Sequence, residues 1–315
     1  MSLPRISIVT PSYNQAQYIK WTVRSVLLQR YANLEYIVMD GGSNDGTLEV
    51  LKPYESRFAH FTSAKDKGQS DAISRGFERS TGDILAYLNS DDMLAPGALH
   101  FVADFFNKNP SVDLIYSNRV TVNAQNKVQW YWLLQKHSNY RMMRWDLMPQ
   151  ETCFWRRRTF EKFGNIDPTY RFAMDYDLFV RYMTGGAKFH HVNRFLGAFR
   201  VHDQAKTSQL MGTIGVEEIQ RVWRQYKIRS WWWDRYVQHR HMHLAMYHGG
   251  RYVNQGLQLP GALRGLEYDY DEVWGGLLND PRLPSAEPPV SAPENVKGVL
   301  VQNPQPEIAA QELNR

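Results

Sequence analysis

The fold is decided by one stretch, Ile84-Leu85-Ala86-Tyr87-Leu88-Asn89-Ser90-Asp91-Asp92. It opens with a short apolar run of the kind that forms a buried strand, and Met93 to Gly97 follow as a turn signal. In an open α/β sheet, ligands bind at the carboxyl ends of strands. Adjacent aspartates there repel each other, so Asp91 and Asp92 stay ionised most easily when a cation or a donor group shares the site. Mg²⁺ and Mn²⁺ take such oxygen ligands and share them with substrate phosphates. The alternative is a plain turn after a strand.

The composition bounds the class of protein. The chain has 315 residues, enough for one large domain with an appendage or for two domains. With 43% hydrophobic and 22% charged residues it can bury a core, as a soluble protein does. The single cysteine, Cys153, excludes an internal disulfide and a cysteine-based zinc site. No stretch approaches the roughly 20 apolar residues that span a bilayer, and the N-terminus has no signal-peptide pattern. We therefore expect a cytoplasmic protein.

The net charge of +5 is unevenly distributed. Between Ile219 and Arg251 the chain has seven Arg or Lys residues against one acid, Asp234. Tryptophans are interleaved with these cations, at Trp223 and at 231–233. The pattern fits a nucleic-acid surface, a membrane-interface patch or a solvated helix.

The apolar periodicity predicts an alternation of strands and helices. Strands are expected over 5–10, 34–39, 60–62, 84–88, 113–116 and 128–132, and helices over 18–28 and 47–54 and from Gly68 onward. This order implies a mostly parallel sheet covered on both faces. Right-handed crossovers then bring the loops after Thr10, Met39, Phe61 and Leu88 to one edge.

The C-terminal third has a different composition. From about Gln204 the sequence indicates helices rich in Trp, Arg and His. After Asp280, the segment 281–315 contains seven prolines, few aromatic residues and no sustained periodicity. We expect a domain over 1–205, a helical extension over 206–280 and a disordered tail over 281–315.

The first two loops contain polar groups suited to a nucleoside. Thr10-Pro11-Ser12-Tyr13-Asn14 places a hydroxyl, an aromatic ring and an amide where a base and a ribose could bind, although Asn14 could instead cap the next helix. The loop 40–47 supplies a carboxylate, Asp40, for a pyrimidine N–H or a ribose hydroxyl, and glycines that allow close approach. In this loop Ser43 or Asp45 could be only a helix cap. Neither the dinucleotide nor the P-loop motif is present in the sequence.

Together these stretches resemble the family 2 glycosyltransferases of the GT-A fold, over residues 5 to about 205. The resemblance rests on four pieces in the family's order and spacing: 6–14, 35–47, Asp66-Lys67-Gly68-Gln69-Ser70-Asp71-Ala72 and Asn89-Ser90-Asp91-Asp92. It implies an α/β fold of the GT-A type, with a Rossmann-like, mostly parallel sheet, helices on both faces and a helical C-terminal extension.

The resemblance also implies a nucleotide-diphosphate-sugar donor and a divalent cation, Mn²⁺ or Mg²⁺. Thr10 and Tyr13 would flank the base, and Asp40 would bind uracil or ribose, in a loop where many members have two aspartates. Asp91 would approach the ribose or the metal, and Asp92 would ligate the ion that bridges the diphosphate. The remaining donor-side residues of the matching motifs are Pro11, Asn14, Gly41, Lys67 and Asp71.

Further likenesses continue toward residue 205. Asp175, in the segment 172–181, matches the family's catalytic base, which takes the proton of the acceptor hydroxyl in an inverting transfer. It could also be an N-cap. Glu151 is either a second acid on the acceptor side or a salt-bridge partner. By the same resemblance His202 would be a metal ligand and Arg200 would contact the substrate.

The leading hypothesis is an inverting glycosyltransferase of cell-surface polysaccharide biosynthesis. It would move a sugar from a UDP-, dTDP- or GDP-linked donor to a hydroxyl of a glycan or lipid-linked glycan, at the inner face of the cytoplasmic membrane. A sugar-nucleotide pyrophosphorylase fits less well, because that class has a Gly-rich loop after the first strand. A third hypothesis is an inactive module that binds membrane or nucleic acid. For Trp231, Trp232 and Trp233 we favour peripheral membrane contact over nucleic acid, with internal packing as the alternative.

Overall fold

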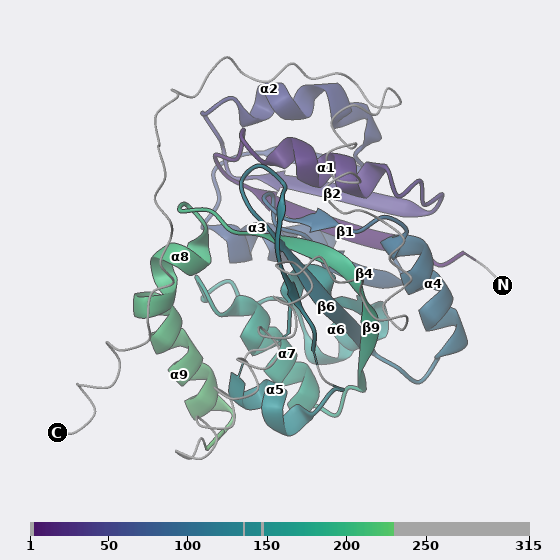
Figure 1. Ribbon diagram of the computed structural model, residues 1–315, viewed down its shortest axis with the longest axis vertical. Coiled ribbons are helices and arrows are strands. Elements are labelled where there is room, and N and C mark those ends of the chain that lie inside the picture. Colours follow the sequence, from purple (N-terminus) through teal and green to yellow (C-terminus); the bar gives the residue numbers. More distant parts are fainter. Residues whose placement is uncertain (1–2, 135, 146–147, 230–315) are drawn as a thin grey trace.

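The structure is a computed structural model that describes residues 3–134, 136–145 and 148–229. These residues form a nine-stranded sheet of order β3-β2-β1-β4-β8-β6-β9-β5, with β7 paired to β6 (Figure 1). The strands are β1 (Ile6–Ser12), β2 (Leu34–Asp40), β3 (His60–Ser63), β4 (Ile84–Tyr87), β5 (Met93–Leu94), β6 (Leu114–Val122), β7 (Val128–Trp132), β8 (Phe154–Arg156) and β9 (Phe189–Arg200).

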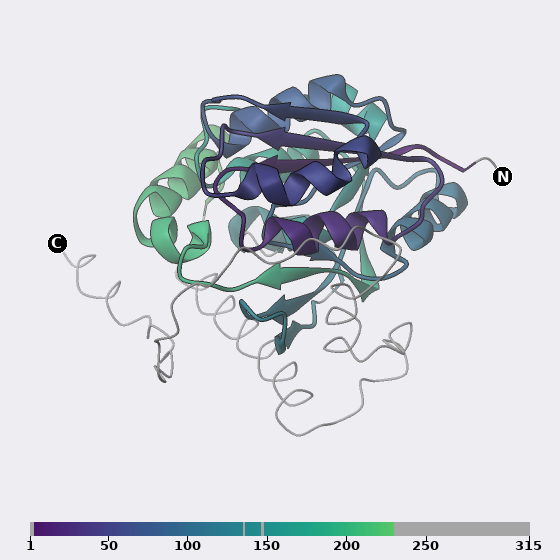
Figure 2. The same cartoon turned by 90° about the horizontal axis from the view of Figure 1, so that it is seen from above.

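Helices cover both faces of the sheet, as the sequence predicts. They are α1 (Ile19–Leu27), α2 (Thr47–Leu51), α3 (Gln69–Arg79), α4 (Ala98–Lys108), α5 (Asn139–Trp145), α6 (Arg157–Phe163), α7 (Met174–Thr184), α8 (Lys206–Leu210) and α9 (Val216–Gln225). Short 3₁₀ turns follow α2 at Lys52–Arg57 and precede β8 at Gln150–Thr152, and a π turn, Met211–Gly215, joins α8 to α9. In Figure 2 strands of the sheet lie between α1 and α2 on one side and α3 on the other.

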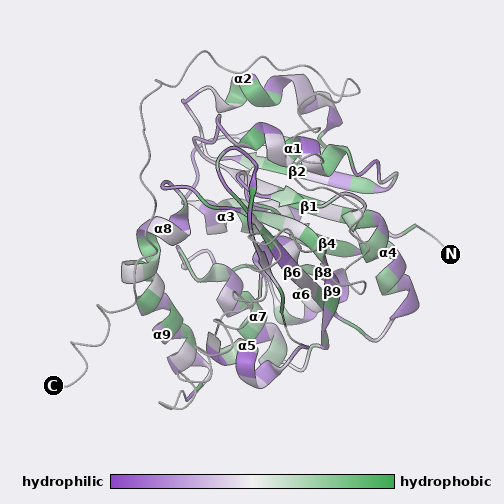
Figure 3. Cartoon of the chain, in the orientation of Figure 1, coloured by the Kyte–Doolittle hydropathy of each residue, from purple (hydrophilic) through white to green (hydrophobic). Residues whose placement is uncertain are grey.

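The parallel half of the sheet is buried on both faces, which explains its near-continuous apolar strands. Along β4, Ile84 and Ala86 pack into the core beneath α1, α2 and α4, while Leu85 and Tyr87 pack into the core beneath α3 and α7. In β1, Ile8 packs into the first of these cores and Val9 into the second. In Figure 3 β4 shows mostly hydrophobic colours, whereas β2 has hydrophilic stretches as well. The predicted fold class is confirmed.

Strand β1 is longer than predicted, because it does not end at Pro11. Pro11 pairs with Met39 in register and the strand continues to Ser12. The carbonyl of Val9 accepts a hydrogen bond from Leu88 at the end of β4. Pro11, two residues on, therefore has its nitrogen on the side where β4 has already ended. A backbone N–H at this position would have no acceptor in β4, so a proline costs no hydrogen bond of the sheet.

The second half of the sheet is mixed, and sequence periodicity found only part of it. β6 runs parallel to β9 and antiparallel to β7 and β8. β9 was not predicted as a strand. The expected turn over residues 93–97 is also wrong at its start, because Met93 and Leu94 form β5, which pairs with Ala198 and Gly197 of β9. The chain turns earlier, where the N–H of Asp92 donates to the carbonyl of Asn89 (3.1 Å).

The first residues of the expected helical extension pack directly on the α/β domain. Val222 of α9 is fully buried in the same core cluster as α7. The indole N–H of Trp223 donates to the hydroxyl of Tyr176 in α7 (2.8 Å). The boundary expected after residue 205 therefore does not coincide with a break in packing. The tryptophans at 231–233 and the proline-rich tail lie outside the described residues. None of the helices within the described part has the length and apolarity needed to span a bilayer.

Close packing of α3 on β1 gives a stability prediction. A Cβ at Gly76 would lie 2.4 Å from Cγ1 of Val9, so Gly76→Ala overpacks the core and is expected to destabilise the protein by about 1–3 kcal/mol. Gly212→Ala is the control, because its Cβ meets nothing within 4 Å. Urea unfolding of both variants measures the difference, and equal stability would mean that α3 does not approach β1 so closely.

Candidate active site

The loops after β1, β2 and β3 meet at one edge of the sheet, as predicted. Ser12 is in register with Asp40, and Asp40 with Ser63. The Asp40 carboxylate is buried and accepts hydrogen bonds from the N–H groups of Gly42 (3.0 Å) and Ser43 (2.9 Å) and from the hydroxyls of Ser43 (2.5 Å) and Ser63 (2.7 Å). Asp40 therefore organises its own loop, and its contact with a base or a ribose stays a prediction.

The first loop is tied to the second by Asn14. Its N–H donates to the Ser43 hydroxyl (2.8 Å), and its side-chain oxygen accepts from the N–H of Asn44 (3.0 Å). Asn14 therefore does not cap α1. The hydroxyl of Thr10 is fully buried and pairs with that of Tyr36 (3.1 Å), so any contact of Thr10 with a base would come from its backbone.

Two further residues of this edge differ in accessibility. The side chain of Tyr13 is 61% exposed, whereas Pro11 is buried. Of the residues expected to contact a base, Tyr13 is thus the one whose ring is freely accessible. In the second loop Asp45 caps α2, accepting from the N–H of Thr47 (3.0 Å), as the alternative for this loop proposed.

The residues before α3 border the same edge. A Cβ at Gly41 would lie 2.9 Å from Oδ2 of Asp66, so Gly41 lets the Asp66 carboxylate approach the second loop. Burial raises the pKa of Asp66. The side chain of Lys67 is exposed, and Asp71 accepts from the N–H of Lys67 (3.2 Å). Asp71 thus ties the chain before α3 to the first turn of that helix.

The paired aspartates end β4 in a buried turn. Asp92 is 1% exposed, and its carboxylate accepts from the N–H of Arg200 (3.0 Å) and from the side-chain amide of Asn89 (3.3 Å). Burial, then the nearby carboxylates of Asp91 and Glu151, raise the pKa of Asp92 well above its usual range. Such a carboxylate favours a proton or a metal cation as partner.

Arg200 is a correction to the sequence prediction. Its guanidinium is fully buried and donates to the carbonyls of Asp91 (2.8 Å) and Asn123 (2.9 Å). Because these bonds use the side chain inside the protein, Arg200 holds the acidic turn and does not reach a substrate. Burial lowers the pKa of this guanidinium, although the carboxylates of Asp92 and Asp91 raise it.

His202 lies beside the acidic turn, as predicted. Its Nε2 is 3.1 Å from Oδ2 of Asp91, and its ring packs 4.4 Å from that of Tyr18. Its Nδ1 is buried without a hydrogen-bond partner among the described residues.

The donor set of the turn fits a hard divalent cation. The carboxylates of Asp91 and Asp92 are oxygen ligands of the kind such a cation takes, and the imidazole of His202 lies beside Asp91. Asp92 lacks a compensating cation at bonding distance among the described residues. No three His, Cys, Asp or Glu side chains in the described part of the chain are already arranged to hold a metal. Mg²⁺ and Mn²⁺ commonly bind through one or two carboxylates and complete their shell with substrate phosphates.

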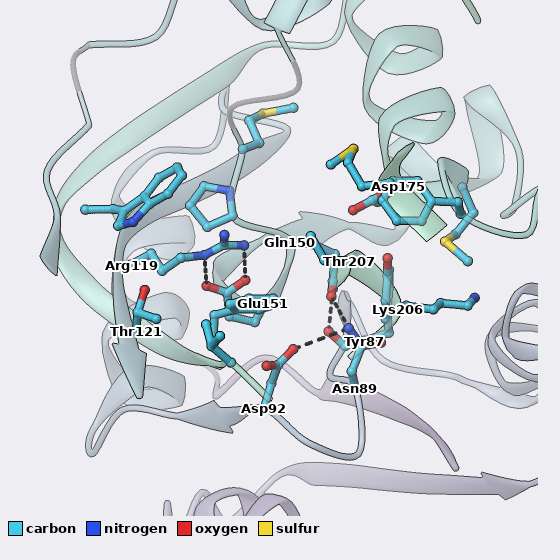
Figure 4. Close-up of a pocket in the computed structure, with 18 of the residues that line it drawn as sticks. Tyr87, Asn89, Asp92, Arg119, Thr121, Gln150, Glu151, Asp175, Lys206 and Thr207 are labelled. Carbon is cyan, nitrogen blue, oxygen red and sulfur yellow. Dashed lines mark hydrogen bonds and ion pairs between the residues drawn. The ribbon is translucent and has the colours of Figure 1, made fainter. Parts of the chain in front are cut away.

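A pocket of about 770 Å³ opens beside the turn (Figure 4). Of the predicted site residues, Asp92, Glu151 and Asp175 line it. In Figure 4, Asp92 and Asp175 lie on different sides of the pocket, and the Arg119–Glu151 pair on its wall. The other predicted residues do not line this pocket: Thr10, Pro11, Tyr13, Asn14, Asp40, Gly41, Lys67, Asp71, Asp91, Arg200 and His202.

Asp175 lies in the first turn of α7, at the pocket wall. Burial raises the pKa of Asp175, whereas the N–H of Tyr176 and the cations Arg119 and Lys206 lower it. Asp177, two residues on, faces elsewhere as predicted and pairs with Arg181 (3.1 Å). The alternative of an N-cap is not observed, because the helix is preceded by Ala173 without a side-chain cap.

A carboxylate from α9 replaces that cap. Glu218 accepts hydrogen bonds from the consecutive N–H groups of Arg171, Phe172 and Ala173, each at 2.8 Å. These N–H groups directly precede α7, whose N-cap is Ala173, and a negative charge is favourable at this end of a helix. Glu218 thereby fixes the start of the helix that carries Asp175.

Glu151 is a salt-bridge partner. Its buried carboxylate receives two hydrogen bonds from the guanidinium of Arg119, at 2.7 and 2.8 Å. The same guanidinium packs over the rings of Phe199 (4.4 Å) and Trp132 (5.6 Å). Glu151 therefore neutralises a cation of the pocket wall, the second of the two roles considered from the sequence.

Several pocket residues were missed by sequence reasoning. Gln69 and Asn89 belong to the motifs that contain Asp71 and Asp91. Their position next to these aspartates in the sequence could have identified them as site residues. The others have no local signature that marks them: Arg119, Trp130, Trp132, Gln150, Phe199 and Lys206. They come from strands and loops that tertiary structure alone brings together.

Known structures share the fold of this chain. Solved structures with this fold include Staphylococcus aureus TarS 1-349 in complex with UDP, 14% identical with a TM-score of 0.56 over 88% of this chain and 79% of that chain. Another is the mannosyltransferase PcManGT of Pyrobaculum calidifontis in complex with GDP-Man and Mn²⁺, 15% identical with a TM-score of 0.54 over 88% and 85%. At these identities the likeness shows the fold, which is that of the GT-A glycosyltransferases.

The sequence gives the family. The model of glycosyl transferase family 2 matches residues 7–166, just over half of the chain, and the chain belongs to this family. An uncharacterized glycosyltransferase of Rickettsia typhi is 26% identical over 229 residues, 70% of each protein. The putative teichuronic acid biosynthesis glycosyltransferase TuaG of Bacillus subtilis is 39% identical over 92 residues, 28% of this chain and 36% of that protein. The matched part thus spans about a third of TuaG.

The hydrogen bonds that Glu218 accepts at the start of α7 can be tested by mutation. Glu218→Ala removes three charge-assisted hydrogen bonds and is expected to lower the free energy of unfolding by about 2–3 kcal/mol. Glu217→Ala is the matched control, because its side chain is exposed on the same turn of α9. Urea unfolding compares the two variants, and equal midpoints would show that Glu218 does not hold the helix.

Proposed function

We propose that the protein is an inverting glycosyltransferase that moves a sugar from a nucleotide-diphosphate donor to a hydroxyl of a glycan or lipid-linked glycan. The observation that carries the proposal is the pocket in which a buried acidic turn and a separate carboxylate on a helix face the same space. The first group is suited to the diphosphate end of a donor, and the second to an acceptor hydroxyl.

Asp175 is the proposed general base. It removes the proton of the acceptor hydroxyl while that oxygen attacks the anomeric carbon and the nucleoside diphosphate leaves from the opposite face. A base must be deprotonated to act. Because burial raises the pKa of Asp175, we expect kcat/KM to rise with pH as the proton is lost and to level off above that pKa.

Asp92 and His202 are the proposed metal ligands, with Asp91 beside them. A divalent cation bound there would offset the negative charge of the leaving diphosphate. The unpartnered Nδ1 of His202 and the raised pKa of Asp92 support this assignment. That PcManGT is in complex with Mn²⁺ adds to it.

The acceptor is proposed to be a carbohydrate of a cell-surface polysaccharide. Trp130, Trp132 and Phe199 give the pocket an aromatic wall, and such rings pack on the apolar faces of sugars. The family member TuaG is named for teichuronic acid biosynthesis, which points to the same class of product. The donor base is left to UDP, dTDP or GDP, since the solved neighbours contain UDP and GDP-Man.

The metal assignment can be tested through nucleotide binding. The melting temperature of the wild type is expected to rise with one of UDP, dTDP or GDP, and to rise further when Mn²⁺ is added. Asp92→Asn is expected to lose the additional Mn²⁺ effect. Asp104→Asn, on the exposed face of α4, is the control and should behave as the wild type. An unchanged Mn²⁺ effect in Asp92→Asn would remove Asp92 from the metal site.

The base assignment can be tested through turnover. Asp175→Asn is expected to bind the nucleotide as the wild type does and to lose about 10²- to 10⁴-fold in kcat, because a general base acts in the transition state. Release of the nucleoside diphosphate from the donor is measured across pH, and the variant should lack the wild-type rise. Full activity of the variant would exclude Asp175 and direct attention to Glu151.

A further inference from the structure

Lys206 is a cation of the pocket that the proposed reaction has not yet used. The charged residues that line the pocket are Asp92, Arg119, Glu151, Asp175 and Lys206. Arg119 is engaged with Glu151 through two hydrogen bonds. The Lys206 ammonium instead donates to the side-chain oxygen of Gln69 (2.5 Å) and to the carbonyl of Arg171. Among the described lining residues, Lys206 is thus the cation that has no carboxylate at salt-bridge distance.

The Lys206 ammonium is connected to the acidic turn by side-chain hydrogen bonds. The amide of Gln69 donates to the side-chain oxygen of Asn89 (2.6 Å), and the amide of Asn89 donates to Asp92 (3.3 Å). An ammonium has three donors, and two of them are used by Gln69 and Arg171. The third has no acceptor among the described residues, and Lys206 lines the same cavity as Asp92.

We propose that Lys206 binds the diphosphate of the donor and stabilises it as the leaving group. This inference rests on the proposed glycosyl transfer. In that step the bond between the anomeric carbon and the β-phosphate oxygen breaks, and its electron pair stays on that oxygen. The acceptor oxygen forms the new bond and its proton passes to Asp175. The charge that develops on the diphosphate is then offset by the ammonium of Lys206, an interaction that strengthens as the bond breaks.

The surroundings of Lys206 agree with a site prepared for an anion. Burial lowers the pKa of Lys206 to about 8, against the effect of the carboxylates Asp175, Glu218 and Asp91, and Arg171 lowers it further. The protein thus leaves this ammonium short of negative charge, and a bound diphosphate would supply it. The Lys206 ammonium is therefore expected to lose its proton at a lower pH than an exposed lysine does.

The test compares nucleotides with their nucleosides. UDP, uridine, GDP, guanosine and inorganic pyrophosphate are titrated calorimetrically into the wild type, Lys206→Met, Lys206→Arg and the control Lys108→Met, which lies on the exposed face of α4. Lys206→Met is expected to weaken binding of the diphosphates about tenfold or more and to leave nucleoside binding unchanged. Lys206→Arg is expected to retain diphosphate binding at pH 9, where the wild type weakens.

Each result decides the assignment. Equal diphosphate affinity in Lys206→Met and wild type overturns it, and so does an equal loss for nucleoside and diphosphate, which would indicate a distorted pocket. If the wild type binds no nucleotide, the proposed glycosyl transfer fails, and the pyrophosphate titration then tests the Lys206 site separately. Pyrophosphate binding that is lost in Lys206→Met supports the anion site. Pyrophosphate binding that is unchanged in Lys206→Met, or no pyrophosphate binding to the wild type, overturns it. Circular dichroism verifies that every variant is folded.

Discussion

The candidate active site depends on one buried cation that does not line its pocket. The guanidinium of Arg200 donates to the carbonyl of Asp91 (2.8 Å), and its backbone N–H donates to the carboxylate of Asp92 (3.0 Å). These bonds join the turn after β4 to the end of β9, 108 residues further along the chain. A buried guanidinium without acceptors would cost several kcal/mol, so the position of Arg200 and the position of the acidic turn fix each other.

The other wall of the pocket is built by the same principle. Arg119 and Glu151 neutralise each other on the strand side, and Glu218 of α9 holds the three N–H groups before Asp175. In each case a charged side chain from a distant segment satisfies groups that local structure leaves open. The parallel half of the sheet therefore carries the loops, while later strands and helices hold the carboxylates of the pocket in place.

This division explains what the sequence could predict. Strands β1 to β4 and their helices have local apolar periods and turn signals, so the fold and the meeting of their loops followed from the sequence. The hydrogen-bond partners of Thr10, Asp40 and Arg200 did not, because a residue at a strand end can face a ligand or a neighbouring loop, and the choice depends on partners far away in the sequence. Strand β9 was missed because polar residues such as Asn193 and Arg194 interrupt its apolar pattern. Lys206 belongs to no motif at all.

The charges of the pocket constrain how a donor can bind. Asp92 and Asp175 both have raised pKa values because burial disfavours their charged forms. A diphosphate adds further negative charge to the same cavity, and a single ammonium, Lys206, cannot balance it. In the proposed reaction such an excess of negative charge is unfavourable, which favours a donor that binds together with a cation. The acidic turn and Lys206 would then be complementary, because the carboxylates would hold the cation that accompanies the diphosphate and the lysine would receive the charge that grows on the leaving oxygen.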